Sequence, residues 1–253
     1  MAAQLPPVVL VTGASRGIGR GIAQHLAKHD ARVALHYASN DTAARDTLAS
    51  LAGDGHALFR ADVADPAACE RLVADVIAHF GRLDVLVNNA GVYEDDSIKT
   101  ASYAEWQRVW RRTIDTNLLG PANLTYLAVQ HFRTRGGGRI VNITSRAAFR
   151  GELTAQSYAA SKAALNITGQ SLARALGADH IHVFTVAPGW IDTDMAVAAL
   201  TGPGAADVLA QHPLGRVGTA DEMGATVAWL ALDAPANLTG CIIDANGASY
   251  LRT

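Results

Sequence analysis

The stretch VVLVTGASRGIG, residues 8–19, decides the fold of this 253-residue chain, because a short apolar run ends in a glycine-rich turn and an Ala-rich helical pattern follows. The glycines at positions 13, 17 and 19 permit a tight turn and let backbone N–H groups approach a pyrophosphate at the positive end of the helix. A glycine turn alone is weak evidence, since many strand-to-helix turns use glycine. On the first such turn of an alternating α/β chain, it predicts dinucleotide binding.

The same alternation of short β-rich runs and longer helical patterns continues to the end of the chain, which is typical of βαβ units around a parallel sheet. We expect an α/β, doubly wound Rossmann fold with a seven-stranded parallel sheet and helices on both faces. The expected strands are Val8–Thr12, Arg32–His36, Ala57–Arg60, Val85–Asn88, Ile140–Thr144, Ile181–Ala187 and Cys241–Asp244. The expected helices are 17–29, 41–52, 66–80, 102–118, 121–135, 157–177 and 220–232.

The domain organisation is expected to be simple, because no Pro/Ser-rich linker, charge block or internal repeat divides the chain. We predict that residues 1–253 form a single dinucleotide-binding and catalytic domain. The Gly- and Pro-rich region 190–218 follows the carboxyl end of a strand, where a substrate lid is expected.

Composition excludes several classes of partner. The formal net charge of −2 gives no electrostatic footprint for nucleic acid or an anionic membrane. No apolar run approaches the roughly 18 residues of a membrane-spanning helix, and the first 11 residues lack the basic start of a signal peptide. Cys69 and Cys241 stand far apart without metal-ligand spacing, which favours a reducing compartment. We therefore expect a cytoplasmic protein that needs no metal.

Tyr158 and Lys162 place a weak acid and a cation four residues apart. In a helix both side chains would share one face, and the ammonium could lower the pKa of the phenol. A chance pair on a solvated helix face is the alternative, although the chain has only three lysines.

The glycine spacing, Gly-x-x-x-Gly-x-Gly, closely resembles the turn of the short-chain dehydrogenase/reductase family in its classical branch. The resemblance covers nearly the whole chain, and its further motifs are Asn88-Asn89-Ala90-Gly91, Asn117, Ser145, the Tyr158/Lys162 pair, and Pro188 to Thr193. Overall similarity is greatest to the 3-oxoacyl-acyl-carrier-protein reductases, although Asp244-Ala245-Asn246-Gly247 replaces their more usual Asp-Gly-Gly. The resemblance implies interconversion of a carbonyl and a secondary alcohol by hydride transfer.

The resemblance also implies four catalytic roles. Tyr158 would protonate the carbonyl oxygen in reduction, and Lys162 would lower the Tyr158 pKa and bond the nicotinamide ribose. Ser145, 13 residues before Tyr158, would donate to the substrate carbonyl, and the main chain of Asn117 would hold a water that links Lys162 to solvent. By itself a serine at a strand end is more often a helix or turn cap, and an ordinary helix-interior position is the alternative for Asn117.

The preferred cofactor is expected to be NADP(H) rather than NAD(H). After the second strand no carboxylate occurs before Asp41, whereas Arg16 in the glycine turn, with Ser39 and Asn40, could surround a 2′-phosphate. A solvated Arg16 is the alternative, and Asp62 could contact adenine or cap its loop. The expected cofactor contacts are Gly13, Ser15, Arg16, Gly17, Ile18, Gly19, Tyr37, Ser39, Asn40, Asp62, Val63, Asn89, Ala90, Gly91, Tyr158, Lys162, Pro188, Gly189, Ile191 and Thr193.

Substrate contacts are expected from residues after the strand ends: Tyr93, Ala147, Phe149 and Trp190, with Arg146, Arg150 and the lid. This mixture of aromatic and basic groups suits an acyl chain, a ring ketone or an anionic carbonyl compound. An acyl carrier protein could meet Arg133, Arg135 and Arg174, although these arginines more readily solvate helix ends.

The family further implies a homotetramer, for which Trp106, Trp110, Leu165 and Leu172 could supply apolar contacts, although core packing explains each equally well. The rival functions are an NAD(P)-dependent dehydrogenase of a sugar, steroid or other secondary alcohol, and a non-catalytic cofactor-sensing module.

Overall fold

The computed structural model describes residues 5–194 and 196–252, and a seven-stranded parallel sheet runs through this part of the chain. The strand order is β3-β2-β1-β4-β5-β6-β9, and every pairing is parallel. The strands are β1 (Val8–Val11), β2 (Arg32–Tyr37), β3 (Ala57–Arg60), β4 (Val85–Asn88), β5 (Gly138–Ile143), β6 (Ile181–Pro188) and β9 (Ile242–Ala245). The doubly wound fold predicted from the alternation is confirmed.

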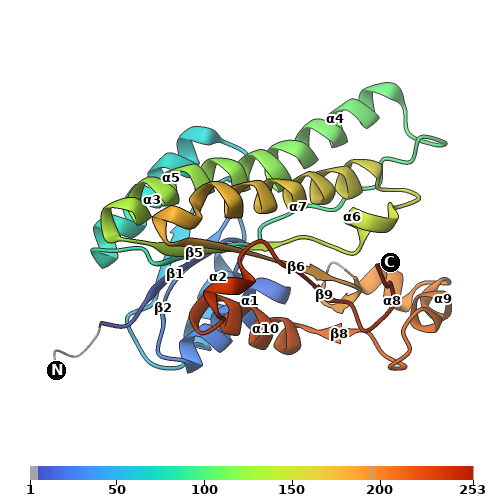
Figure 1. Ribbon diagram of the computed structural model, residues 1–253. Helices are drawn as coiled ribbons and strands as arrows, with labels where there is room; N and C mark the ends of the chain where they lie inside the picture. The colour runs from blue at the N-terminus through green and yellow to red at the C-terminus, as the bar shows by residue number, and fades with distance from the viewer. Residues whose placement is uncertain (1–4, 195, 253) are drawn as a thin grey trace.

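Helices cover both faces of the sheet (Figure 1). One layer holds α3 (Pro66–Phe80), α4 (Tyr103–Ile114), α5 (Gly120–Arg135) and α7 (Gln156–Leu176), and the other holds α1 (Gly17–Lys28), α2 (Asp41–Ala49) and α10 (Ala220–Leu232). Shorter segments are η1 (Asp115–Leu119), α6 (Ala147–Arg150), η2 (Gly177–Asp179), β7 (Ile191–Asp192), α8 (Val197–Thr201), α9 (Ala205–Ala210), β8 (Gly218–Thr219) and η3 (Ala236–Leu238).

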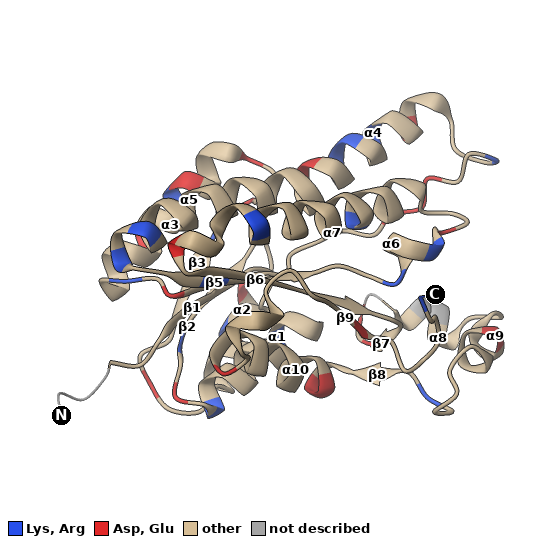
Figure 2. Cartoon of the chain, viewed as in Figure 1, with Lys and Arg blue, Asp and Glu red and all other residues tan. Residues whose placement is uncertain are grey.

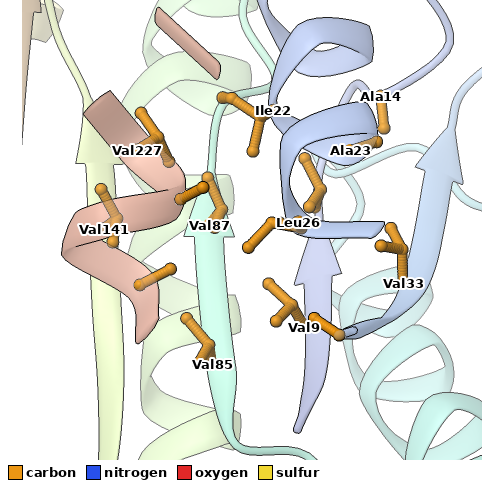
Figure 3. Packing of buried hydrophobic residues seen from close by; sticks show 14 of the residues in the cluster. Val9, Ala14, Ile22, Ala23, Leu26, Val33, Val85, Val87, Val141 and Val227 are labelled. Carbon is orange, nitrogen blue, oxygen red and sulfur yellow. The ribbon is translucent and has the colours of Figure 1, made fainter. Parts of the chain in front are cut away.

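Strand β1 explains why two helical layers form. Its side chains alternate between the faces, and both faces are apolar and fully buried. Val9 and Val11 belong to the core beneath α1 and α10, shown in Figure 3, whereas Val8 and Leu10 belong to the core beneath α3 and α5. Since β1 also lies between β2 and β4, the strand order reverses there, which opens a ligand crevice at the carboxyl ends of the two central strands.

The helix starts follow local capping chemistry. Asp65 and Ser102 accept hydrogen bonds from the first turns of α3 and α4, and Thr219 forms a reciprocal capping box with Glu222 at the start of α10.

Charges of both signs are interspersed over the outer helices and loops in Figure 2, in keeping with the small net charge.

The structure differs from the sequence-based expectation between residues 102 and 135. Two separate helices were expected, but the chain stays helical from Tyr103 to Arg135, with the π-helical segment η1 joining α4 to α5. Pro121 is tolerated because it lies at the start of α5, in the first helical positions. The short elements α6, β7, α8, α9 and β8 were not expected. None of the described helices is long and apolar enough to cross a membrane.

Helices α1 and α10 pack with their backbones in close approach. A Cβ added at Gly224 would overlap the carbonyl oxygen of Gly21 and lie 2.6 Å from Cδ2 of His25. A Cβ at Gly21 would likewise overlap the carbonyl oxygen of Ala220. The two helices can therefore approach this closely only because neither glycine carries a side chain.

We predict that Gly224→Ala lowers the free energy of unfolding by about 1–3 kcal/mol, because a methyl group must separate two packed backbones. Gly177→Ala is the matched control, since nothing lies within 4 Å of its added Cβ, and it should shift stability by no more than about 1 kcal/mol. Urea unfolding of both variants is the measurement. Equal stability of the two variants would contradict the close packing.

Candidate active site

The glycine turn lies at the carboxyl end of β1, where the strand order reverses. Gly13 and Gly17 have φ values of +63° and +54°, a region that side-chain-bearing residues rarely adopt. Helix α1 begins at Gly17, and its N-cap residue Arg16 makes no side-chain hydrogen bond to the helix. The first N–H groups of α1 are therefore free of a side-chain cap, an arrangement that suits a phosphate.

The residues that follow β4 hold the glycine turn from one side. The Asn89 side-chain amide donates to the carbonyl oxygens of Thr12 (2.8 Å) and Gly13 (3.1 Å). The Thr12 hydroxyl in turn accepts from the N–H groups of Asn89 and Ala90, both at 2.9 Å. The carboxyl ends of β1 and β4 are thus locked together.

His36 holds the turn from the other side. Its Nδ1 accepts from the Gly13 N–H at 3.1 Å, so the ring proton lies on Nε2, which donates to the Ala61 carbonyl at 3.1 Å. Burial lowers the pKa of His36 to about 4, so the imidazole is neutral at pH 7. This histidine ties together the ends of β1, β2 and β3.

The segment after β6 faces the glycine turn across the crevice. A Cβ at Gly17 would lie 3.2 Å from Cγ2 of Thr193. The Gly189 N–H donates to Ala245, and Ile191 is buried in the short β7–β8 pairing. The structure thus brings the predicted residues Pro188 to Thr193 to the crevice that the glycine turn borders.

The region expected to meet the adenosine ribose lies after β2. Ser39 and Asn40 are exposed there, but the Asn40 side chain caps α2 by accepting from the Ala43 N–H at 3.0 Å. The Asp41 carboxylate accepts from Arg45 and from the Tyr37 hydroxyl, both at 2.7 Å, and these bonds hold its pKa below the usual value. The first carboxylate after β2 is therefore already engaged.

Three other predicted cofactor residues have local roles in the structure. Arg16 is 66% exposed and lies 3.8 Å from the Asp194 carboxylate, which makes a weak surface ion pair. Asp62 accepts from the Ala64 N–H at 3.0 Å, which is the loop-capping alternative, and Val63 is buried against Gly120. Ser15 and Ile18 lie half-buried in the turn.

Tyr158 and Lys162 share one face in the first turns of α7, as their spacing predicts. The Lys162 ammonium lies 5.6 Å from the centroid of the Tyr158 ring and donates to the Ile143 carbonyl at 3.0 Å. The predicted lowering of the Tyr158 pKa is, however, wrong for this structure. Burial raises the pKa of Tyr158 to about 12 and lowers that of Lys162 to about 8.

The reason is that burial removes both groups from water, which disfavours the charged form of each. The Lys162 ammonium lies at the ring face and is occupied by a carbonyl, and the Ser145 side chain is the group that acts against burial by hydrogen bonding to the phenol and lowering its pKa. A phenol with this pKa keeps its proton throughout the neutral range. It can therefore start the reaction as a proton donor, although a pKa this far above neutrality makes it a weaker acid than a phenol nearer 7.

Ser145 and Asn117 reach the same place from two other elements. The Ser145 hydroxyl oxygen accepts from the Ala147 N–H at 3.1 Å, and its proton can be donated to the Tyr158 oxygen or to another acceptor beside it. Asn117 is buried in the π-helical η1, and its side chain pairs with the Val92 N–H (2.8 Å) and carbonyl (2.9 Å). Ser145 therefore does more than cap a turn, because it also contacts the phenol. Asn117 is more than an ordinary helix position, because its side chain holds the loop after β4.

Gly91 connects these groups, since its added Cβ would lie 3.2 Å from Asn117 Oδ1 and 3.4 Å from Lys162 Nζ. The structure therefore brings Asn117 and Lys162 together beside the end of β4. A glycine leaves open, next to the Lys162 ammonium, the space that a side chain would fill.

The four predicted substrate residues have different surroundings. Tyr93 packs edge-on against Tyr158, with ring centroids 5.0 Å apart, and is 36% exposed. Phe149 stacks on Tyr250 near the chain's end, whereas Ala147 is buried and offers no accessible surface. Trp190 is half-buried, and its carbonyl pairs with the Gly218 N–H at 3.0 Å.

The basic candidates are placed away from the crevice or are already engaged. Arg146 is 3% exposed and donates to Gln211 Oε1 at 3.0 Å, which ties the end of β5 to the predicted lid. Arg133 pairs with Asp179 at 2.8 Å in the last turn of α5, which supports a structural role at the helix end rather than contact with an acyl carrier protein. Arg174 lies 16 positions after Tyr158 on α7, or about 24 Å along the axis, so it cannot border the same opening.

Sequence reasoning missed the role of His36, because a single histidine in an apolar strand gives no distinguishing pattern. In the described ranges, no group of three His, Cys, Asp or Glu side chains is arranged to hold a metal ion.

We predict that His36 makes folding acid-sensitive. Its pKa is about 4 when folded and about 6.5 when unfolded, so the unfolded state binds the proton more readily, and stability falls as the pH drops from about 6.5 to 4. The loss should reach about 3 kcal/mol. Urea unfolding from pH 7 to 4.5 should show a shallower dependence in His36→Gln than in the wild type, and parallel curves would contradict this assignment.

Known proteins share both the sequence and the fold. Residues 13–247 match the family described as "Enoyl-(Acyl carrier protein) reductase". The 3-oxoacyl-[acyl-carrier-protein] reductase of Escherichia coli is 38% identical, covering 96% of this chain and 97% of its own length. An acetoacetyl-CoA reductase from Shinella zoogloeoides is also 38% identical, covering 96% and 98%.

A solved structure of a doubly substituted Serratia marcescens short-chain dehydrogenase/reductase superposes with a TM-score of 0.88. It is 33% identical, and the match covers 97% of this chain and 98% of the other. With the seven-stranded sheet and the matched relatives, these likenesses show that the chain belongs to the short-chain dehydrogenase/reductase family and is an NAD(P)-dependent oxidoreductase acting on CH–OH groups.

Proposed function

We propose that this protein reduces the 3-oxo group of an acyl thioester with NADP(H), and that Tyr158 is the proton donor. The observation that carries the proposal is geometric: Tyr158 lies beside Ser145, with the Lys162 ammonium 5.6 Å from its ring centroid, and Asn117 and Lys162 meet beside Gly91. In a reductase the phenol must be protonated at neutral pH, and this environment keeps it so.

The residues around the crevice fit a dinucleotide. The N–H groups at the start of α1 and the glycines at 13 and 17 would hold the pyrophosphate, and Thr193 would border it from the opposite side. Pro188 to Ile191 would line the nicotinamide end, and the lack of a side chain at Gly91 would keep the ribose's approach to Lys162 clear. When bound, the reduced nicotinamide supplies the hydride that reaches the carbonyl carbon.

The chain's own residues would manage the carbonyl oxygen and its proton. Ser145, with its oxygen already bonded to the Ala147 N–H, would donate to the carbonyl oxygen as negative charge develops there. The Tyr158 phenol would transfer its proton to that oxygen, which completes the alcohol. Lys162 would bond the nicotinamide ribose, and the main chain of Asn117 would hold the water through which the phenolate is reprotonated.

The preference for NADP(H) is supported by charge. Asp41 is engaged by Arg45 and Tyr37, so it is a poor acceptor for a free 2′-hydroxyl, whereas Arg16 is exposed beside the glycine turn. A 2′-phosphate would offer Arg16 a stronger partner than the 3.8 Å contact with Asp194.

The acyl-thioester substrate is supported by the names of the matched relatives and by apolar surface near the site. Leu153, just before α7, is 92% exposed, and Val197, Leu209 and Leu214 are exposed in the predicted lid. An acyl chain would cover such side chains. An acyl carrier protein remains part of this proposal as the thioester's carrier.

We also propose one domain and a homotetramer. Tyr126 on α5 and Ile167 on α7 are exposed apolar side chains that support assembly through these helices. Leu165, by contrast, is buried within the fold, and Leu172 packs against the core, so neither is needed for an interface.

We predict that Tyr158→Phe lowers kcat by at least about 100-fold, because the proton donor is lost. Tyr93→Phe is the matched control, since it removes a hydroxyl from the adjoining ring and should retain most activity. Steady-state reduction of a carbonyl substrate measures both. Turnover above a few per cent in Tyr158→Phe would defeat the proposed acid.

We predict that the purified enzyme reduces an acetoacetyl thioester with a higher kcat/KM than simple ketones, and uses NADPH better than NADH. Arg16→Ala should lower kcat/KM for NADPH about tenfold, the equivalent of 1.4 kcal/mol, with little effect on NADH. Arg20→Ala, at an exposed position of α1, controls for the lost charge. Equal or better use of NADH would overturn the cofactor assignment, and a preference for sugars or steroids would overturn the substrate class.

A further inference from the structure

Asp96 lies in the loop between Gly91 and Ser102, and none of its surface is exposed. Its two carboxylate oxygens accept hydrogen bonds from the backbone N–H groups of Gln156 (2.6 Å) and Ser157 (2.9 Å). Its own N–H donates to the Thr154 carbonyl at 2.7 Å. A buried acid 60 residues earlier in the chain is therefore fastened to the start of α7.

Helix α7 needs this contact because it lacks a cap of its own. Its N-cap residue is Ala155, which makes no side-chain hydrogen bond. Gln156 and Ser157 are the first two residues of the helix, and their N–H groups have no partner within it. The Asp96 carboxylate satisfies both, and its negative charge lies at the positive end of the helix dipole.

We propose that Asp96 is a positioning residue for the reaction: it fixes the first turn of α7 so that Tyr158, the third residue of that helix, is held in its reactive place. The inference rests on the proposed role of Tyr158 as proton donor. Asp96 itself does not touch the reacting atoms, and it acts through the backbone of the two residues before Tyr158.

The loop that carries Asp96 is itself anchored on both sides of the site. Val92 is clamped by the Asn117 side chain, and Glu94 forms ion pairs with Arg108 (3.1 Å) and Arg112 (3.0 Å) of α4. Between them, Tyr93 packs against the Tyr158 ring. The loop that carries Asp96 is therefore held by contacts of its own, and its position does not depend on α7 alone.

A second tie makes the placement specific to the catalytic turn. Asn117 also donates to the Ser161 hydroxyl at 3.2 Å, and Ser161 in turn donates to the Tyr158 carbonyl at 2.7 Å. The residues on both sides of Tyr158 are thus held to the loop after β4. Loss of the Asp96 contact would release Gln156 and Ser157, before Tyr158, whereas Asn117 would still hold Ser161, which follows it.

The test is Asp96→Asn, which keeps the shape and one acceptor oxygen but replaces the other with an amide that cannot accept. We expect kcat to fall about 10- to 100-fold, because displacements of about 1 Å at reacting groups have effects of this size, while KM and cofactor affinity change less than about threefold. Asp65→Asn is the matched control: Asp65 caps α3 through the Ala67 N–H at 2.9 Å, and its loss should leave kcat unchanged.

The assays use whichever carbonyl compound the wild type reduces, at a temperature where each variant is folded by circular dichroism. Hydrogen exchange should show faster exchange at Gln156 and Ser157 in Asp96→Asn. If that variant does not fold, Asp96→Ser, which keeps one hydroxyl acceptor, takes its place.

A folded Asp96 variant with kcat within twofold of the wild type would overturn the proposal, as would an equal loss of kcat in Asp65→Asn. Tyr158→Phe separates this outcome from a failure of the proposed function. If Tyr158→Phe is inactive and Asp96→Asn is fully active, only the positioning role fails. If Tyr158→Phe remains active, Tyr158 is not the proton donor, and the proposed function fails whatever the result for Asp96→Asn.

Discussion

The structure depends on how polar backbone groups are satisfied where the parallel strands end. At the carboxyl ends of β1, β2 and β4 the sheet ladder stops, and a loop there would leave buried N–H and carbonyl groups without partners. Three side chains replace the ladder: His36 and Asn89 bond the backbone of the glycine turn from the two neighbouring strands, and Thr12 bonds the backbone that follows β4. The turn can then remain open to a ligand without loosening the core.

Much of this could be predicted from the sequence because the signals are local. Apolar runs such as Val8–Val11, glycines at positive φ and the four-residue step from Tyr158 to Lys162 each encode a backbone geometry, and all seven principal strands lie where the runs predict them. The contacts that were missed are formed by residues distant in sequence. His36 with Gly13 and Asp96 with Gln156 depend on three-dimensional proximity that no spacing reveals.

The charge state of the candidate site could not be predicted for a related reason. Helical spacing indicates that Tyr158 and Lys162 are neighbours, but the pKa of each group is set chiefly by how far it is removed from water. Desolvation opposes the attraction expected from spacing alone. The two effects have opposite signs, and only the packed environment decides between them.

The π-helical segment η1 between α4 and α5 sets the rotation of the α5 side chains relative to those of α4. A π turn holds one more residue than an α turn, so it rotates whatever follows by about 100° relative to a regular helix. Asn117 sits inside this widened turn, where its amide meets both Val92 and α7. Loss of one residue from this segment could leave a continuous helix intact and still turn Asn117 away from its partners, so a deletion too small to disturb the architecture could dismantle the alignment of three elements.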